Sequence, residues 1–415
     1  MANIAPFKGV RYNTEKIKDL SKVVAPPYDV ISRDEQRKLH GSEEHNIIRV
    51  LLGEDLPGDD DKENKYTRAA GFLNKWTKSG VLKKDEEKSI YVYSQEFEVE
   101  GARKNRLGFM SLLKLEDFDT DSSSVYPHEN TLQAPKEDRA KLISSINANL
   151  GPIFAVYGDE DRSLHVILTK ETMNEPTIDI VDPHGIRNRL WRVTDRLTVD
   201  KIVSLMKSKK LFIADGHHRY EVGLMYSKLK NDPNHKYILT YFTDIYADGI
   251  VVLPVHRIIS GISKDSLAMF RKKLEEDFRH EAIERQEIKD FLSKASALEK
   301  RFVLYDGRDF LGLSVPIKDK ASLDVTVLHG DIIARLEKIA SKRKEDVSID
   351  FTKDLNYAIE EVEKGRASIS IIVNPTKITE IRDKALSGQR MPQKSTYFYP
   401  KVLTGLVINI FNSGI

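Results

Sequence analysis

The sequence predicts a mixed α+β fold in two domains, and three observations lead to this prediction. The chain has 415 residues, of which 40% are hydrophobic, enough for a substantial core and for more than one domain. Short apolar runs typical of strands alternate with stretches of helical spacing. From about Ser260 onward the helical stretches become longer and more strongly charged. We therefore predict one domain at 1–260 and a C-terminal α+β domain at 261–415 that closes a cleft with the first.

The first part of the chain is expected to form helices, a strand and a hairpin. Ser32 and Glu35 have the spacing of a capping box at a helix start. HNIIRVLLG, residues 45–53, is apolar and rich in β-branched residues, which favours a strand, whereas EDLPGDDDKENKY after it is too charged to bury and predicts a loop. AAGFLNKWTKSGVL has helical spacing with Gly80 as its C-cap. The alternation in SIYVYSQEFEVEGARKNRLGFMSLLKLEDF predicts a hairpin.

The rest of the chain alternates helices with short strands. Helical spacing is found in KEDRAKLISSINANLG, LTVDKIVSLMKSKK, the segment after Gly216 and DSLAMFRKKLEEDFRHE. Strands are predicted at IFAVYGDED, HVILTK, PTIDIVD, HGIRNRLWRVTD, LFIAD, HKYILTYFTD, GIVVLPVHRII, RFVLYDG, FLGLSV and ASISIIV.

The composition excludes several classes of function. The 66 Lys and Arg residues nearly balance the 64 Asp and Glu residues, so a net charge of +2 gives no global field to attract nucleic acid or an anionic membrane. Without cysteine the chain has no disulfide, no thiolate nucleophile and no cysteine-ligated metal. No apolar run approaches the roughly 18 residues of a membrane span, and the N-terminus lacks the apolar segment of a signal peptide. We expect a soluble, cytoplasmic protein.

The segment FIADGHHRYE holds the strongest candidate site. It predicts a buried strand that ends at Asp215, a tight turn at Gly216, and a helix whose first turn contains His217, His218 and Arg219. The N–H groups at a helix start attract anions, and Arg219 can bind phosphate through paired hydrogen bonds. Cations at a helix start are otherwise unfavourable, which favours a functional site. We predict a phosphate site in which Asp215, His217 and His218 are catalytic and Gly216 and Arg219 bind the cofactor.

A structural alternative exists for the same segment. Asp215 would cap the helix, one histidine would be buried with a partner, and Arg219 would pair with Glu221 or Asp215. The two alternatives differ in the effect of Arg219→Ala. A phosphate site predicts loss of ATP or ADP binding at a nearly unchanged melting temperature, whereas a structural role predicts destabilisation by roughly 1 to 3 kcal/mol.

Two further loops carry candidate residues. His128 and Glu129 stand side by side on a loop interrupted by proline, which suits proton transfer or metal binding, and we assign both as catalytic. The alternative is an N-cap and a surface pair. Asp29 follows two prolines that stiffen its turn. We assign Asp29 and Glu129 as magnesium ligands, with an Asx-turn as the alternative for Asp29.

Near the C-terminus, polar residues flank an aromatic strand in RMPQKSTYFYPKVLTGL: Lys394, Ser395, Thr396 and Lys401. A Lys-Ser-Thr cluster suits phosphate, and its hydroxyls suit magnesium, so we assign 394–396 to cofactor binding. The segment lacks the G-x-x-x-x-G-K-[ST] pattern of a Walker A loop. The alternative is a core strand with Tyr397 and Tyr399 on one face and Phe398 on the other.

Six segments together resemble an uncharacterised bacterial and archaeal family labelled ParB-like: APFKGV, PPYDVIS, HNIIRV, PHENT, ADGHHRYE and MPQKSTYFYPK. More distantly, ADGHHRYE resembles the turn with which the ParB/sulfiredoxin-like superfamily, including free serine kinases, holds nucleotide phosphates. The resemblance implies a ParB/sulfiredoxin-like core elaborated with extra strands, with Gly216, His217, His218 and Arg219 at the matching positions. Sulfiredoxin's own chemistry needs a cysteine in this turn and is excluded.

Two functions follow from these residues and the resemblance. The first is phosphoryl transfer on a small metabolite by a kinase or phosphatase with ATP or ADP and Mg²⁺, and the superfamily implies serine or phosphoserine as that metabolite. The second is a nucleotide-responsive, ParB-like DNA-binding or regulatory protein, which would need a helix-turn-helix and a basic face that we do not find. We favour the enzyme, expect a phosphorylated small molecule as its partner and neither membrane nor nucleic acid, and leave a homodimer open.

Overall fold

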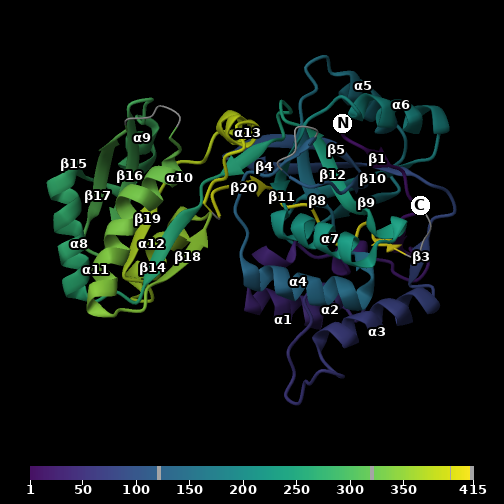
Figure 1. The fold of residues 1–415 in the computed structure, drawn as a ribbon, viewed down its shortest axis with the longest axis horizontal. Helices are drawn as coiled ribbons and strands as arrows, with labels where there is room; N and C mark the ends of the chain where they lie inside the picture. Colours follow the sequence, from purple (N-terminus) through teal and green to yellow (C-terminus); the bar gives the residue numbers. More distant parts are fainter. Residues whose placement is uncertain (119–122, 318–321, 393, 412–415) are drawn as a thin grey trace. The chain divides into compact units, whose positions relative to one another are not determined.

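The computed structural model describes residues 1–118, 123–317, 322–392 and 394–411. The chain forms two compact units (Figure 1), the first made of Met1–Pro127, Thr131–Val251 and Pro400–Ile415 and the second of His128–Asn130 and Val252–Tyr399. Each unit contains both sheet and helices, so the mixed α+β prediction is confirmed. The limits predicted from the sequence, 1–260 and 261–415, differ from these two units at residues 128–130, 252–260 and 400–415. Among the described residues no helix is long and apolar enough to cross a bilayer.

A mixed nine-stranded sheet forms the centre of the first unit. Its strands follow in the order β6 (Val125–Tyr126), β11 (Leu211–Asp215), β8 (Ile153–Tyr157), β12 (Tyr237–Asp244), β5 (Ala102–Lys114), β4 (Ile90–Val99), β10 (Arg187–Val193) and β9 (Ile178–Val181), and β1 (Ile4–Ala5) pairs with β5. Two short ladders accompany it, β2 (Val10–Tyr12) with β3 (Leu82–Lys84) and β7 (Ala148–Asn149) with β21 (Asn409–Ile410).

The pairing of strand β8 with its two neighbours shows which strand ends lie on the same side of this sheet. It runs antiparallel to β11, so Asp215 at the end of β11 lies beside Phe154 near the start of β8. It runs parallel to β12, so Asp244 at the end of β12 lies beside Tyr157 at the end of β8. Asp215 and Asp244 therefore lie at opposite ends of β8.

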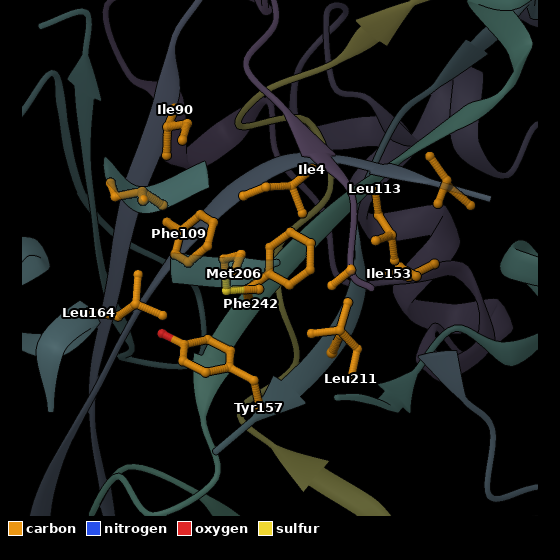
Figure 2. Close-up of a cluster of buried hydrophobic side chains, with 14 of the residues drawn as sticks. Ile4, Ile90, Phe109, Leu113, Ile153, Tyr157, Leu164, Met206, Leu211 and Phe242 are labelled. Atoms are coloured by element: carbon orange, nitrogen blue, oxygen red, sulfur yellow. The ribbon is translucent and has the colours of Figure 1, made fainter. Parts of the chain in front are cut away.

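Helices α5 (Ser163–Glu171) and α6 (Arg196–Met206) pack on one face of the sheet. Their residues Leu164 and Met206 join Ile90, Phe109 and Phe242 in the main hydrophobic core (Figure 2). The other helices of this unit are α1 (Arg33–Ser42), α2 (Ile48–Leu51), α3 (Lys65–Lys78), α4 (Gln133–Ile146), α7 (His217–Lys230) and the short 3₁₀ segments η1 (Leu20–Lys22), η2 (Tyr28–Val30) and η3 (Pro233–His235).

Two predicted strands are helices in the structure. HNIIRV contains α2, where the Asn46 side chain accepts a hydrogen bond from Ile48 N at 2.8 Å and the apolar residues are buried. HVILTK lies in α5, whose first turn donates from His165 N to Asp159 Oδ2 at 3.0 Å. Both predictions were wrong because a short apolar run is compatible with a buried helix as well as a strand, and tertiary contacts decide between them.

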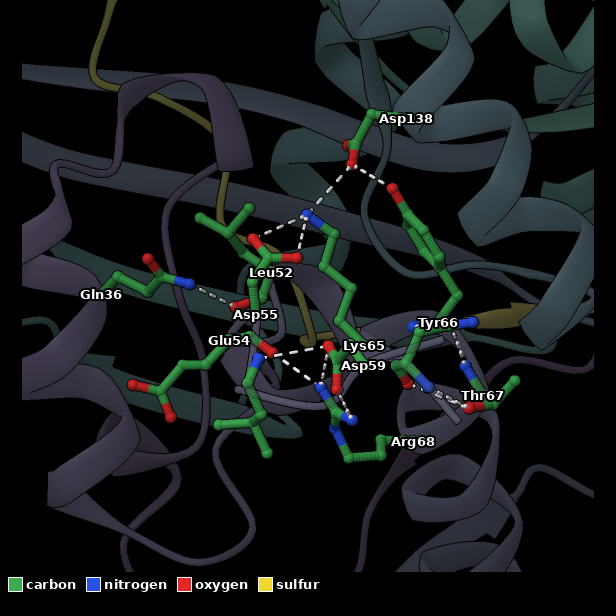
Figure 3. A network of polar contacts seen from close by, with 12 residues as sticks. Gln36, Leu52, Glu54, Asp55, Asp59, Lys65, Tyr66, Thr67, Arg68 and Asp138 are labelled. Carbon is green, nitrogen blue, oxygen red and sulfur yellow. Dashed lines mark hydrogen bonds and ion pairs between the residues drawn. The ribbon is translucent and has the colours of Figure 1, made fainter. Parts of the chain in front are cut away.

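The predicted charged loop before α3 is confirmed and is tied down by ion pairs (Figure 3). Arg68 donates to both carboxylate oxygens of Asp59, at 2.6 and 2.8 Å, and Tyr66 donates to Asp138 at 2.8 Å. Asn64 caps α3 by accepting from Tyr66 N and Thr67 N. These contacts order a segment that cannot be buried.

The second unit is built on a six-stranded antiparallel sheet. Its strands follow in the order β15 (Arg279–Ile283), β17 (Phe310–Pro316), β16 (Glu299–Tyr305), β19 (Ile369–Ile372), β14 (His256–Ser260) and β18 (Ser348–Thr352), and β13 (Val251–Leu253) pairs with β20 (Tyr397–Tyr399). The helical segments are α8 (Lys264–Asp277), η4 (Arg285–Glu287), α9 (Ile288–Ser293), α10 (Asp324–Val327), the π-helix η5 (Leu328–Ile333), α11 (Ala334–Arg343), α12 (Leu355–Glu363) and α13 (Ile378–Leu386).

Candidate anion site at the start of α7

The predicted strand, turn and helix around Gly216 are present. β11 ends at Asp215, Gly216 has a φ of 92°, and α7 begins at His217. A Cβ on Gly216 would lie 2.9 Å from Arg219 Nη2 and 3.0 Å from Ile153 Cγ2, so both the backbone angle and the space require glycine. The capping position of α7 belongs to Gly216, which has no side chain. The structural alternative gave that position to Asp215.

Two cations hold the carboxylate of Asp215. Arg219 Nη2 donates to Asp215 Oδ2 at 2.7 Å, Arg219 Nη1 donates to the carbonyl oxygen of Pro152 at 2.6 Å, and Lys401 Nζ donates to Asp215 Oδ1. The side chains of Asp215 and Lys401 are each 11% exposed and that of Arg219 is 17% exposed. The structural pairing of Arg219 with Asp215 is therefore confirmed. Two positive charges and one negative charge lie beside the helix start.

The two histidines of the turn have different surroundings. His217 is buried, at 7% exposure. His218 Nε2 accepts a hydrogen bond from Leu132 N at 2.9 Å, which requires this nitrogen to be unprotonated and the ring to be neutral. One turn later Glu221 Oε2 accepts from Thr131 Oγ1 at 2.6 Å. The first turns of α7 are thus bound to the segment that leads into α4.

A small cavity of about 60 Å³ adjoins Arg219. Its lining is mainly apolar, with Tyr28, Arg139 and Asn149 as polar members. The Arg139 guanidinium lies 4.1 Å from the centre of the Tyr28 ring. Burial, and then the charge of Asp29, raise the pKa of the Tyr28 phenol, so it stays a neutral hydrogen-bond donor. A cavity of this size holds one or two water molecules and no nucleotide base.

The second unit brings together two other predicted loops. Glu129 Oε1 accepts hydrogen bonds from Ser395 N at 3.2 Å, Thr396 N at 3.0 Å and Thr396 Oγ1 at 2.9 Å. His128 Nε2 lies 3.1 Å from Thr396 Oγ1. Lys394 is exposed and has a φ of 52°. The structure thus joins His128, Glu129, Ser395 and Thr396 in one cluster. The hydrogen-bond donors of Ser395 and Thr396 that could bind a phosphate are already bound to the Glu129 carboxylate.

Sequence reasoning missed three cations, one in the second unit and two in the first. Arg257 is 1% exposed in the second unit, and burial, partly offset by Glu129, lowers its pKa to about 10. Lys401 was noted only as a flank of an aromatic strand, and Arg139 was not singled out at all. Nothing in the local sequence separates these residues from solvated Lys and Arg, because their roles depend on partners far along the chain.

Comparisons with known proteins assign the family. The family described as "Protein of unknown function (DUF1015)" matches residues 4–330. The chain belongs to this family. A search among curated proteins gave no match.

Solved structures resemble this DUF1015 protein at low identity. A conserved hypothetical protein from Pyrococcus furiosus is 12% identical, with a TM-score of 0.38 over 70% of this chain and 94% of its own. A free serine kinase in complex with AMP is 13% identical, with a TM-score of 0.38 over 70% and 90%. A variant free serine kinase in complex with ADP is 11% identical, with a TM-score of 0.40 over 70% and 91%.

The magnesium assignment to Asp29 and Glu129 stays a prediction for this DUF1015 protein. Asp29 is exposed in η2 of the first unit, and Glu129 belongs to the second unit. Within the described ranges, no group of three or more His, Asp or Glu side chains is arranged to hold a metal ion.

Proposed function

We propose that the start of α7 binds the phosphate of a nucleotide or phosphorylated metabolite, and that the protein transfers a phosphoryl group there with ATP or ADP and Mg²⁺. The observation that carries the proposal is the helix start at Gly216, a capping residue with no side chain, with Arg219 and Lys401 on one carboxylate beside it. Backbone N–H groups at a helix start and paired guanidinium donors are the groups that bind phosphate. The resemblance to the ParB/sulfiredoxin-like superfamily points to serine or phosphoserine as the metabolite.

In the proposed mechanism, Asp215 is the group that accepts a proton. Its carboxylate holds Arg219 and Lys401 close to the helix start. A phosphate that binds these two cations would replace part of those contacts and leave Asp215 beside the reacting group. Asp215 can then accept the proton of an attacking hydroxyl, while the cations offset the charge on the phosphoryl oxygens. His218 could take up a proton at Nε2 only after this nitrogen releases Leu132 N.

Calorimetry with ATP, ADP, phosphoserine and serine, each with and without Mg²⁺, tests the proposal. Arg219→Lys keeps the charge but loses the two-pronged donor, so we expect phosphate ligands to bind at least tenfold more weakly. Asp215→Asn removes the competing charge, so we expect equal or tighter binding together with loss of turnover. Arg196→Lys, on an arginine whose side chain is 92% exposed, is the matched control. Unchanged binding of the phosphate ligands by Arg219→Lys, or no binding of any of them by the wild type, would refute the phosphate site.

A further inference from the structure

The first unit contains a second, larger cavity. It lies at the end of β8 that is opposite to the start of α7. It measures about 780 Å³, within the usual range for small-molecule sites. It lies where the neighbouring parallel strands β8 and β12 end, between the sheet and α5. Carboxyl ends of parallel strands are common places for ligands. The α7 turn lies at the other end of β8, so this cavity is separate from the proposed phosphate site.

Asp244 lines this cavity, and one of its carboxylate oxygens is held by backbone N–H groups. Its Oδ1 accepts hydrogen bonds from Asp159 N at 3.1 Å and Tyr246 N at 3.2 Å, which orient the group. Among the described residues none donates a hydrogen bond to Oδ2. Burial first, and then the charge of Asp159, raise the pKa of Asp244. Burial thus makes the ionised carboxylate costly, and a cation beside it would stabilise it.

The remaining charges of the lining favour a cation. Asp159 is paired with Lys209 at 3.3 Å, and Arg189 is paired with Glu96 at 3.2 Å. The other charged lining residues are the carboxylates Glu160, Asp244 and Asp248 and the guanidinium of Arg162. Protonation of His165, which lines the same cavity and acts electrostatically on Asp244, would offset part of this negative charge.

Ser94 supplies an independent sign of a ligand. It lines the cavity, is 2% exposed, and its hydroxyl has no hydrogen-bond partner among the described residues. Alternation along β4 puts Ser94 on the face of Ile90 and Val92, which pack in the core with α5. It stands directly opposite Arg189 on β10. A buried hydroxyl without a partner is uncommon and fits a polar group of a bound molecule.

Aromatic rings complete the lining. Trp191, Tyr157 and Tyr246 all border the cavity, and the Tyr157 ring lies near Leu164 of α5 in Figure 2. Aromatic faces attract ammonium groups. We propose that this cavity binds a small metabolite whose ammonium group pairs with Asp244 Oδ2, with a polar group at Ser94. The inference does not depend on the proposed phosphoryl transfer.

Calorimetry and thermal shift on the full chain, with choline and putrescine as probes, test the inference. We expect both to raise the melting temperature, and the neutral carbon isostere of choline, dimethylbutanol, to have no effect. Asp244→Asn keeps the oxygen that accepts from Asp159 N and Tyr246 N, so we expect at least tenfold weaker probe binding with an equal or higher melting temperature without ligand. Ser94→Ala should weaken binding without lowering that melting temperature.

Glu175→Gln, at an exposed carboxylate outside the lining, is the control and should bind the probes as the wild type does. The inference is overturned if neither ammonium probe binds at millimolar concentration, if dimethylbutanol binds as well as choline, or if Asp244→Asn binds the probes with unchanged affinity. An unstable Asp244→Asn protein would also overturn it, since it would show that the carboxylate serves the fold.

Discussion

Glu129 and Thr396 are 267 residues apart in sequence, yet one carboxylate oxygen of Glu129 accepts hydrogen bonds from both the backbone N–H and the hydroxyl of Thr396. The backbone N–H of Ser395 donates to the same oxygen. Consecutive backbone N–H groups that converge on one point form an anion-binding arrangement. Here the anion is part of the protein, which fastens residues 128–130 to the end of the second unit.

Glu129→Ala is expected to destabilise the second unit by about 1 to 3 kcal/mol, because partly buried donors lose their acceptor. Glu129→Gln keeps an acceptor oxygen and should cost less, with a remaining loss because the buried Arg257 guanidinium loses its nearby charge. Urea unfolding followed by far-UV circular dichroism measures both. Glu281→Gln, at an exposed residue of β15, is the control. Equal midpoints for Glu129→Ala and the wild type would contradict the fastening role.

Gly216→Ala is expected to destabilise the first unit by more than about 1 kcal/mol, because its φ of 92° is strained for alanine and a Cβ would lie 2.9 Å from Arg219 Nη2. Gly71→Ala is the matched control. Gly71 lies within α3, and a Cβ there would meet no described atom within 4 Å outside its own helix, so alanine should stabilise by about 0.5 to 1 kcal/mol. Thermal unfolding of the two variants should shift in opposite directions. An unchanged or higher melting temperature for Gly216→Ala would show that the turn tolerates a side chain.

The sequence was most informative where chemistry and backbone requirements coincide. Asp215, Gly216 and the following helix could be predicted because a glycine between an apolar run and a helical pattern has few other uses. The two loops that carry Glu129 and Thr396 were each recognised, but their mutual contact spans most of the chain and has no local pattern. Lys401 could not be linked to Asp215 for the same reason.

The prediction of secondary structure was wrong where the apolar run was short. HNIIRV and HVILTK have strand-like composition, yet their residues are helical because Asn46 and Asp159 bind backbone N–H groups at the helix starts. Such caps were recognised at Ser32, which accepts from Glu35 N at 3.2 Å as predicted, because the capping residue immediately precedes a polar helix. Asp159 precedes the apolar run by several residues, so the sequence did not show that it would bind the first N–H groups of a helix there.

Arg219→Ala is expected to lower the stability of the first unit, as the structural alternative predicts, whereas the phosphate site alone predicted a nearly unchanged melting temperature. The guanidinium bridges the Pro152 carbonyl and Asp215, so its removal leaves a partly buried carbonyl and carboxylate with fewer donors. We expect a loss of about 1 to 3 kcal/mol for alanine and a smaller loss for Arg219→Lys, which can keep the ion pair.

Tryptophan fluorescence measures this change in the first unit. The chain has two tryptophans, Trp76 and Trp191, and both belong to that unit. The control is Arg196→Lys, which should unfold with the wild type. If Arg219→Ala unfolds at the wild-type urea concentration, these contacts do not stabilise the ligand-free protein.

Two histidines make the second unit sensitive to acid. Burial first, and then the charge of Arg257, lower the pKa of both His256 and His329 to about 4. In the unfolded chain a histidine titrates near pH 6.5, so between about pH 6.5 and 4 the unfolded state binds more protons than the folded state. The stability is therefore complete above about pH 6.5 and falls as the pH decreases towards 4. For His256, which is 3% exposed, the loss is on the order of 2 to 3 kcal/mol.

Acid titration with two probes tests this assignment. Because both tryptophans lie in the first unit, the second unit should lose far-UV circular dichroism on acidification before tryptophan fluorescence changes. His256→Asn keeps an acceptor for Val373 N, which donates to His256 Nδ1 at 3.3 Å, but cannot take up the proton, so we expect a shallower loss of stability between pH 6.5 and 4. His280→Asn, at an exposed residue of β15, should leave the acid profile unchanged. If His256→Asn follows the wild-type profile, the proton is taken up elsewhere and burial of His256 does not limit the acid stability.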